Sequence, residues 1–433
     1  MNIRFKNARV LTMADGFNIM ENAEVHVRGK KITYIGAADK KEDRTNHWDK
    51  TVDVKGNLLM PGFKDAHTHS AMTFLRTNAD DMKLQDWLTK EVFPYEAKLT
   101  AEDIYYCTKL AVLEYLTSGI TAICEMYFEP QAIAKATEES GMRCVQVSPL
   151  SGGDNVPQKI ACLRDMYKKF NEGNPLTTCQ IGLHAEYTCS KELLEETAKL
   201  VNELKVPFYA HMSETKSEVE GCIERYGMPP VEFADSIGLF NYGGAIFHGV
   251  HLNDKEIEIL KKRGVSVVTN PASNSKLASG IAPIERLLKE GINVAIGTDG
   301  PASNNCLDMF REMFLTTALA KLREDDAAAV DANKVLYMAT VGGAKALNLN
   351  DSDVLTAGKN ADMIMIDLNQ PNMRPFNNIT KNIVYSGSKI NVKMTMVNGK
   401  ILYMDGKFNI GEDPEAIYRD VQNVIDSFKN GTR

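Results

Sequence analysis

The sequence lacks several features that would place it in other classes of protein. No uninterrupted apolar stretch is long enough to cross a bilayer, and the first residues lack the apolar core of a signal peptide. The net charge is -7, with acids and bases mixed along the chain, so no basic stripe indicates a nucleic-acid or membrane partner. The eight cysteines occur singly, without a Cys-x-x-Cys motif. We therefore expect reduced core cysteines and a cytoplasmic location.

The chain also lacks the marks of a repeat array or of an open nucleotide-binding sheet. It has no internal repeat and no low-complexity linker, and no Gly-x-Gly-x-x-Gly motif follows a predicted strand. Its 433 residues, 44% hydrophobic and 25% charged, are typical of a folded soluble protein. This length suits one large domain with a smaller one beside it.

The pattern of short apolar segments divides the chain into three parts. Residues 1–56 and 359–433 contain mainly short strands, and the final stretch 414–429 has the pattern of a helix. We predict that the strands of both chain ends form one small β-sandwich domain. Residues 57–358 instead alternate apolar strands with longer amphipathic helices, which predicts a parallel sheet with right-handed crossovers.

Eight strands can be counted in the middle part, which favours an α/β fold with a (β/α)8 TIM-type barrel. An open doubly wound sheet is the alternative, and the missing glycine motif disfavours it. After the opening strand, which ends in the segment 58–69, the expected strands are 120–124, 143–147, 180–183, 206–210, 245–247, 265–268 and 292–296. In the C-terminal part they are 361–367, 382–385, 392–397 and 400–403.

A His-x-His motif ends the opening segment. Residues two apart on a strand point the same way, so His67 and His69 aim two imidazoles at one point beyond the strand. Further polar residues end later strands, where the loops of a parallel barrel converge: His184 the fourth, His211 the fifth and Asp299 the eighth. This pattern favours a shared site over isolated polar residues at strand ends.

The expected metal ligands are His67, His69, His211 and Asp299, around one divalent ion. A catalytic metal keeps a position open for water and lowers the pKa of that water. Asp299 is also expected to accept the water's proton. Zinc suits these ligands best, and iron, manganese or nickel also fit a His/Asp site.

Two more residues are expected to act in catalysis. Glu214 lies three residues after His211 and is predicted to be the general acid that protonates the substrate. His248 ends the sixth strand and is expected to hold or steer the attacking hydroxide. We expect the remaining histidines to carry no chemistry: His26 and His47 as solvated residues, and His251 as a structural one.

The motifs together resemble the amidohydrolase superfamily, and within it the mononuclear aminohydrolases. The 5′-methylthioadenosine/S-adenosylhomocysteine deaminases are the most similar group. The resemblance covers nearly the whole chain and is carried by residues 61–69, 211–215, 270–277 and 297–305. Binuclear relatives carry a bridging carboxylated lysine at the end of the fourth strand, where this chain reads Gly182-Leu183-His184. The resemblance therefore implies one metal and disfavours hydantoin-type and urea-type hydrolysis.

The resemblance also implies a nucleoside pocket. In adenosine-type deaminases a Trp and a Glu after the first strand line this pocket, and Trp87 and Glu96 match them. Glu96 would accept hydrogen bonds from the ribose hydroxyls. His184 matches a histidine that faces the substrate, and Glu214 and Ser303 complete the expected substrate-binding set.

One departure from the family concerns the 5′ end of the nucleoside. Members that accept S-adenosylhomocysteine are expected to hold its amino-acid tail with arginines after the third strand. Residues 148–153 contain no arginine, and only Lys159 and Arg164 follow. This favours an uncharged 5′ substituent, as in methylthioadenosine, 5′-deoxyadenosine or adenosine.

The sequence thus predicts a metal-dependent hydrolytic deaminase that converts an adenosine-type nucleoside to the inosine analogue and ammonia. An aminohydrolase or chlorohydrolase of another heterocycle, such as guanine, cytosine or a triazine, is the alternative. A non-catalytic binding module ranks last, because such proteins usually lose metal ligands. A homo-oligomer, dimer or tetramer, is expected from the family.

Overall fold

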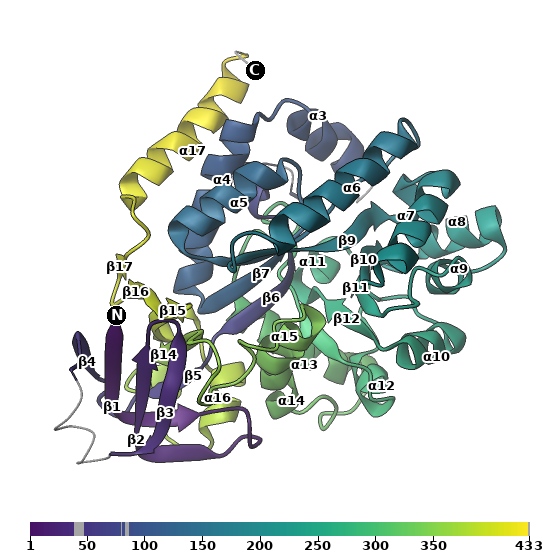
Figure 1. Cartoon of the computed structure of the whole chain (residues 1–433). Helices are drawn as coiled ribbons and strands as arrows, with labels where there is room; N and C mark the ends of the chain where they lie inside the picture. Colours follow the sequence, from purple (N-terminus) through teal and green to yellow (C-terminus); the bar gives the residue numbers. More distant parts are fainter. Residues whose placement is uncertain (39–46, 79, 83–85, 432–433) are drawn as a thin grey trace.

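The computed structural model describes residues 1–38, 47–78, 80–82 and 86–431 and contains two sheets (Figure 1). One is an eight-stranded parallel sheet that closes almost into a barrel, with helices around it. The other is a nine-stranded mixed sheet to which both chain ends contribute. The predicted TIM-type barrel with a small β unit from both ends is therefore confirmed.

The barrel strands follow the chain in spatial order, and each neighbouring pair is parallel. They are β6 (Phe63–Thr68), β7 (Ile120–Glu125), β8 (Arg143–Val147), β9 (Thr177–Ala185), β10 (Phe208–Met212), β11 (Gly244–His248), β12 (Val265–Thr269) and β13 (Val294–Ile296). Every residue of β6, β7 and β12 is buried, as expected for strands covered on both faces. Because the strands share one direction, their carboxyl ends meet at one mouth.

Helices surround the barrel in the connections between its strands. The larger ones are α4 (Ala101–Thr117), α5 (Pro130–Ser140), α6 (Val156–Asn171), α7 (Lys191–Leu204), α8 (Lys216–Tyr226), α9 (Pro230–Ser236), α10 (Asp254–Arg263) and α13 (Met309–Glu324). Shorter ones are α11 (Pro271–Lys276), α12 (Ile284–Lys289), α14 (Ala332–Tyr337) and α15 (Gly343–Ala346). In α8 both ends are set by local sequence. Thr215 caps its start by accepting from the Glu218 N–H, and Gly227 ends it in a left-handed conformation.

The mixed sheet runs in the order β17-β16-β15-β14-β5-β1-β2-β3, with β4 also paired to β1. Its strands are β1 (Asn2–Leu11), β2 (Ile19–Arg28), β3 (Lys31–Ala37), β4 (Lys50–Asp53), β5 (Leu58–Pro61), β14 (Met363–Ile366), β15 (Val392–Val397), β16 (Lys400–Met404) and β17 (Lys407–Phe408). The sheet folds back on itself, since the Ile32 N–H donates to the Lys359 carbonyl at 3.0 Å. A Cβ on Gly399 would lie 2.0 Å from the Gly29 oxygen, so only glycine permits this contact.

Two predicted strands need correction. The apolar run 58–60, expected to belong to the first barrel strand, lies in β5 of the mixed sheet, and β6 begins after it. The predicted strand 382–385 is part of the helix α16 (Ile379–Tyr385), which Asn378 caps by accepting from the Lys381 N–H. A short apolar run fits one face of a helix as well as a strand, and the cap decides here. The domain limits at residues 56 and 358 stay predictions.

The structure tests the expected surroundings of two histidines, His26 and His47. The prediction that His26 is solvated is wrong: it is buried, bonds the Glu24 carboxylate at 2.9 Å and lies between the rings of Tyr34 and Trp48. Its neighbours are charged in sequence, but the folded sheet covers this face. His47 is exposed, as predicted.

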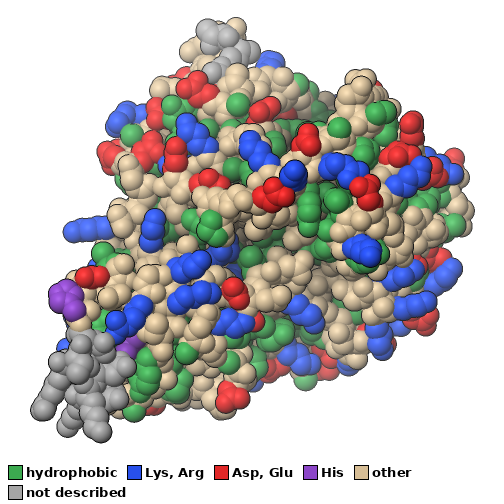
Figure 2. All heavy atoms as spheres, in the orientation of Figure 1, with side chains coloured by type: hydrophobic (Ala, Val, Ile, Leu, Met, Phe, Trp, Pro, Cys, Tyr) green, Lys and Arg blue, Asp and Glu red, His purple; other side chains and the backbone are tan. Residues whose placement is uncertain are grey.

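The surface carries both signs of charge. On the face drawn in Figure 2, basic and acidic side chains are interspersed rather than gathered by sign. No helix within the described ranges has the length and apolar character needed to cross a membrane.

Candidate active site

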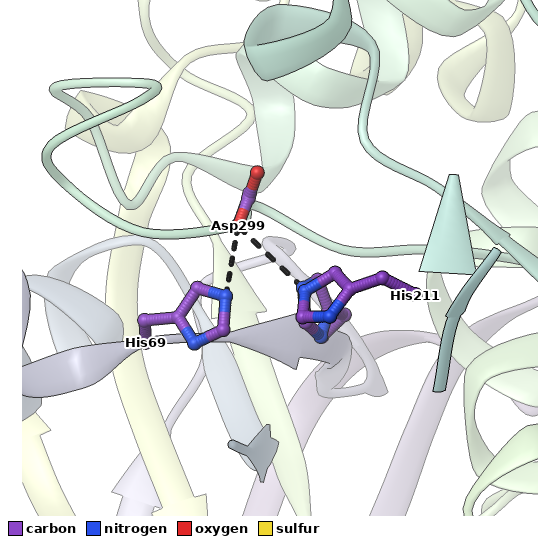
Figure 3. A group of neighbouring side chains, drawn as sticks. His69, His211 and Asp299 are labelled. Carbon is purple, nitrogen blue, oxygen red and sulfur yellow. Dashed lines mark hydrogen bonds and ion pairs between the residues drawn. The ribbon is translucent and has the colours of Figure 1, made fainter. Parts of the chain in front are cut away.

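Four side chains converge at the mouth of the barrel. His67 belongs to β6, His69 follows that strand, His211 belongs to β10 and Asp299 follows β13. One potential ligand atom from each lies within 4.8 Å of all the others. Figure 3 shows His69, His211 and Asp299 pointing toward one another. The structure therefore brings together the four residues predicted as metal ligands.

The distances within the cluster are short. Asp299 Oδ1 lies 3.2 Å from His69 Nε2 and 3.5 Å from His67 Nε2. His211 Nε2 lies 3.1 Å from His67 Nε2. Three nitrogens and one carboxylate oxygen around a common point are a donor set that suits zinc and other divalent transition metals.

The far nitrogens of two imidazoles are fixed by backbone carbonyls. His69 Nδ1 donates to the Met126 oxygen at 2.5 Å, and His211 Nδ1 donates to the His184 oxygen at 2.6 Å. With its proton on Nδ1, each ring turns the lone pair of Nε2 toward the cluster. Such bonds set the tautomer that metal binding needs.

Asp299 is positioned where β13 approaches β6 to close the barrel. Its N–H donates to the His67 oxygen at 2.9 Å, and its backbone has a left-handed φ of 58°. A Cβ on Gly297 would lie 2.7 Å from the same oxygen, so glycine lets β13 approach β6 here. The Asp299 carboxylate accepts from Ser273 Oγ at 2.6 Å.

The electrostatics of the cluster favour a bound cation. Burial lowers the pKa of His67 to about 3 and the pKa of His211 well below its usual range, so both side chains are neutral. Burial also opposes charge on His69, yet the hydrogen bond and charge of Asp299 raise the pKa of His69 to about 9. The carboxylate thus attracts positive charge to this point, as a divalent ion would provide.

A cavity opens above the cluster, with about 860 Å³ of empty space that includes open solvent. The cavity is lined by all the residues predicted to bind substrate and by the predicted catalytic residues: Trp87, Glu96, His184, Glu214, His248, Asp299 and Ser303.

Glu214 and His248 lie side by side on the cavity wall. Glu214 Oε1 accepts from Ser279 Oγ at 2.8 Å, and Glu214 Oε2 lies 3.8 Å from His248 Nε2. His248 Nδ1 donates to Asn274 Oδ1 at 2.8 Å, which directs Nε2 into the site. His248 also has a left-handed φ of 72°, a strained conformation of the kind found at functional sites.

Trp87 and Glu96 come from one short connection after β6. Trp87 begins the π-helical turn η2 (Trp87–Val92), and Glu96 ends the single turn α3 (Phe93–Glu96). Glu96 accepts a hydrogen bond from the Tyr127 hydroxyl at 2.6 Å. Burial raises the pKa of Glu96 to about 6, although the bond from Tyr127 acts in the opposite direction.

Among the described residues that line the cavity, none is a lysine or an arginine. Lys159 instead donates to the Ser151 oxygen at 2.7 Å and to Asp154 at 2.9 Å. Arg164 pairs with Glu203 at the surface. The basic residues after the third strand are therefore engaged elsewhere.

Comparison with known proteins agrees with this geometry. Residues 58–402 match the model of the amidohydrolase family. The chain belongs to the amidohydrolase family. It is 41% identical to a 5-methylthioadenosine/S-adenosylhomocysteine deaminase of Thermoanaerobacter pseudethanolicus, over 96% of this chain and 97% of that one. It is 38% identical to a 5′-deoxyadenosine deaminase of Methanosarcina mazei, over 96% of each chain.

Solved structures of the amidohydrolase fold also superpose on the chain. An adenosine deaminase from Xanthomonas campestris with bound zinc has a TM-score of 0.93 and 31% identity, over 99% of this chain and 98% of that one. A triazine hydrolase variant has a TM-score of 0.90 at 22% identity, over 98% and 99%, which shows the shared fold alone.

The end of the fourth strand differs from that of a lysine-bridged binuclear centre. β9 contains no lysine, and His184, its second-last residue, has Nδ1 at 3.0 Å from Thr188 Oγ1. His184 is half-buried, and its ring centroid lies 4.8 Å from that of His211.

Several residues that hold the site in place were given no role from the sequence. Ser273, Asn274 and Ser279 bond to Asp299, His248 and Glu214 respectively, and all three lie in or next to the motif 270–277. Their spacing in that motif was the available signal. Tyr127 and the buried Glu125, which accepts from the Ser70 N–H at 3.1 Å, had no such signal.

Proposed function

We propose that the chain is a metal-dependent hydrolytic deaminase of adenosine-type nucleosides, releasing ammonia and the inosine analogue. The observation that carries this proposal is a three-histidine, one-aspartate cluster at the floor of a cavity that Glu214 and Glu96 also line. The names of the two relatives described above, which this chain matches over nearly its whole length, support the same substrate class.

The proposed cofactor is one divalent ion, most simply zinc, held by His67, His69, His211 and Asp299. Such an ion acts as a Lewis acid and activates a water for attack at neutral pH. The zinc in the Xanthomonas campestris structure supports this choice, and iron, manganese and nickel are the alternatives that the donor set also fits.

The side chains of the site divide the proton transfers between them. Asp299 accepts the proton of the water that attacks C6 of the adenine. Glu214, which lies across the cavity, delivers a proton to N1, so that the ring accepts the developing charge. His248, oriented by Asn274, would stabilise the charge that develops at the metal centre. Asp299 then passes its proton to the amino group, the C6 hydroxyl returns a proton to Glu214, and ammonia leaves as the ring becomes the hypoxanthine form.

The finer proposal concerns the 5′ substituent. The described cavity lining offers no cationic side chain for the carboxylate of an amino-acid tail, and it includes the apolar residues Leu88, Phe93 and Phe128. We therefore propose methylthioadenosine, 5′-deoxyadenosine or adenosine as substrates ahead of S-adenosylhomocysteine. Trp87 and Glu96 are proposed to hold the nucleoside, with His184 and Ser303 completing the site.

The test is a substrate panel on zinc-loaded protein. Adenosine, 5′-deoxyadenosine, methylthioadenosine and S-adenosylhomocysteine are followed by adenine absorbance and by ammonia release. We expect conversion of the first three with a higher kcat/KM than the fourth, loss of activity after chelation, and recovery with zinc. A panel in which no purine nucleoside changes, while guanine, cytosine or a chlorotriazine does, would overturn the substrate proposal.

Two further proposals concern the location and the assembly of the protein. All eight cysteines are free, which supports a reducing compartment such as the cytoplasm. We propose a homo-oligomer, dimer or tetramer. Light scattering after size exclusion distinguishes these states from a monomer.

A further inference from the structure

The end of β7 connects the metal cluster to the substrate cavity. Its last residue, Glu125, accepts from the Ser70 N–H through both carboxylate oxygens at 3.1 Å. The next carbonyl, that of Met126, accepts from Nδ1 of His69 at 2.5 Å. Tyr127 follows, and its hydroxyl lies 2.6 Å from Glu96 Oε1. Residues 125–127 thus contact both the metal cluster, through Ser70 and His69, and the substrate cavity, through Glu96.

The Glu96 side chain is only half-buried. It ends the single turn α3, none of whose four residues is buried. A glutamate side chain has several rotatable bonds, so its carboxylate needs a partner to stay in one place. Tyr127 is buried, with 3% of its surface exposed, and provides a rigid donor on the cavity wall.

The hydrogen bond from Tyr127 makes the two oxygens of the Glu96 carboxylate different from each other. Oε1 is engaged by Tyr127. Oε2 makes no hydrogen bond with the part of the chain that the structure describes, and Glu96 lines the cavity. Tyr127 therefore holds Oε1 in place, while Oε2 can accept a hydrogen bond from a ligand in the cavity. A ligand whose hydroxyl groups lie next to Glu96 can donate to a carboxylate that already has the required position.

We propose that Tyr127 is a positioning residue for nucleoside recognition: its hydroxyl holds the Glu96 carboxylate so that the free oxygen accepts from the sugar diol. This inference rests on the proposed function and extends it to a residue outside the motifs. Tyr127 does not touch the reacting atoms, so its contribution belongs to binding rather than to the chemical step. The residue that would position Glu96 for the sugar diol therefore directly follows Met126, whose carbonyl holds His69 at the end of β7.

The test is Tyr127→Phe, which removes only the hydroxyl. We expect KM for adenosine to rise about 10- to 100-fold with kcat nearly unchanged, as for the loss of one hydrogen bond to a charged group. For 2′,3′-dideoxyadenosine, which lacks the diol, the variant and the wild type should have the same kcat/KM. In a Glu96→Gln background, Tyr127→Phe should add no further loss. Calorimetry with inosine gives a binding readout independent of turnover.

The matched control is Tyr105→Phe. Tyr105 donates to Glu139 over the same 2.6 Å, but on the outer helix α4 and away from the cavity. It should leave KM unchanged. Equal losses for adenosine and dideoxyadenosine, or no loss for either, would overturn the positioning role. If the wild type neither binds nor deaminates any purine nucleoside, the proposed function itself fails, and that result is distinct from an unaffected Tyr127→Phe enzyme.

Discussion

At the scale of single residues, Glu214 shows how the fold holds the proposed general acid in one place. Ser279 donates to one of its oxygens, and the other lies 3.8 Å from His248 Nε2. Its backbone N–H donates to Glu218 at 2.7 Å, which anchors the residue at the start of α8. The carboxyl group is thus held in the cavity and close to the metal cluster without being part of it.

Replacing Glu214 by glutamine should remove proton transfer while keeping size and shape. We expect Glu214→Gln to lower kcat by about 10²- to 10⁴-fold, the usual contribution of a general acid, with KM changed little. Metal content, measured by elemental analysis, should match the wild type. Glu220→Gln, an exposed change on the same helix, is the control and should have normal kinetics. A fully active Glu214→Gln enzyme would exclude the proposed general acid.

A second residue, Glu312, links stability to pH. It is fully buried on α13, where it accepts from the Ala272 N–H at 3.0 Å and from Asn304 Nδ2 at 2.8 Å. Burial raises the pKa of Glu312 to about 8, although these hydrogen bonds act against the rise. The folded state therefore binds this proton more tightly than the unfolded state does.

The raised pKa of Glu312 makes the protein less stable at higher pH. Between the unfolded pKa near 4.5 and the folded pKa of about 8, the folded protein carries more protons, so stability falls as pH rises. One linked proton contributes a slope of up to about 1.4 kcal/mol per pH unit. We expect urea unfolding of Glu312→Gln to show a shallower fall between pH 5 and 8 (the window set by these two pKa values). Glu324→Gln, exposed on the same helix, should keep the wild-type slope.

At the scale of elements, the C-terminal helix α17 (Pro414–Lys429) supports the substrate-binding connection. In Figure 1 it lies beside α4, against which it packs. Near its end, the ring of Phe428 meets Tyr95 edge to face with centroids 5.6 Å apart, and lies 5.9 Å from Phe74. Tyr95 directly precedes Glu96, so the last helix of the chain restrains a turn that lines the cavity.

Removing this aromatic contact should loosen the cavity wall. We expect Phe428→Ala to raise KM about 5-fold through misplacement of the segment 87–96, with a smaller effect on kcat. Hydrogen exchange of that segment should become faster. Tyr418→Ala, an exposed aromatic on the same helix, provides the matched control. Unchanged exchange and KM in Phe428→Ala would show that α17 only covers α4.

At the scale of the whole molecule, a buried ion pair joins the barrel to the mixed sheet. Arg143 on β8 donates to both oxygens of Asp362 at 2.7 and 3.1 Å. Asp362 directly precedes β14, is almost fully buried and also accepts from the Asn398 N–H at 2.7 Å. The pair therefore connects a barrel strand, β14 and the hairpin between β15 and β16.

Breaking this pair on one side should leave an uncompensated buried cation. We expect Asp362→Ala to lower the free energy of unfolding by about 3–5 kcal/mol in a denaturant titration. Glu203→Ala, which breaks the exposed pair with Arg164, should cause no measurable change. A stability for Asp362→Ala within error of the wild type would show that Arg143 finds another partner or water.

The sequence by itself determined the barrel and the identity of the converging side chains. The spacing of apolar segments is a local property, and a parallel barrel brings the residues after its strands to one mouth. For that reason His67, His69, His211 and Asp299 could be grouped from the sequence, and the structure brings their ligand atoms within 4.8 Å.

Only the tertiary structure decided which partners hold those side chains. The bonds from Tyr127 to Glu96 and from Ser273 to Asp299 join elements that are distant in sequence. Likewise, nothing local distinguishes β5 from the barrel strand after it, or the helix α16 from a strand, because a short apolar run fits either environment. Such choices depend on which surfaces meet when the chain packs, and that is a property of the whole fold.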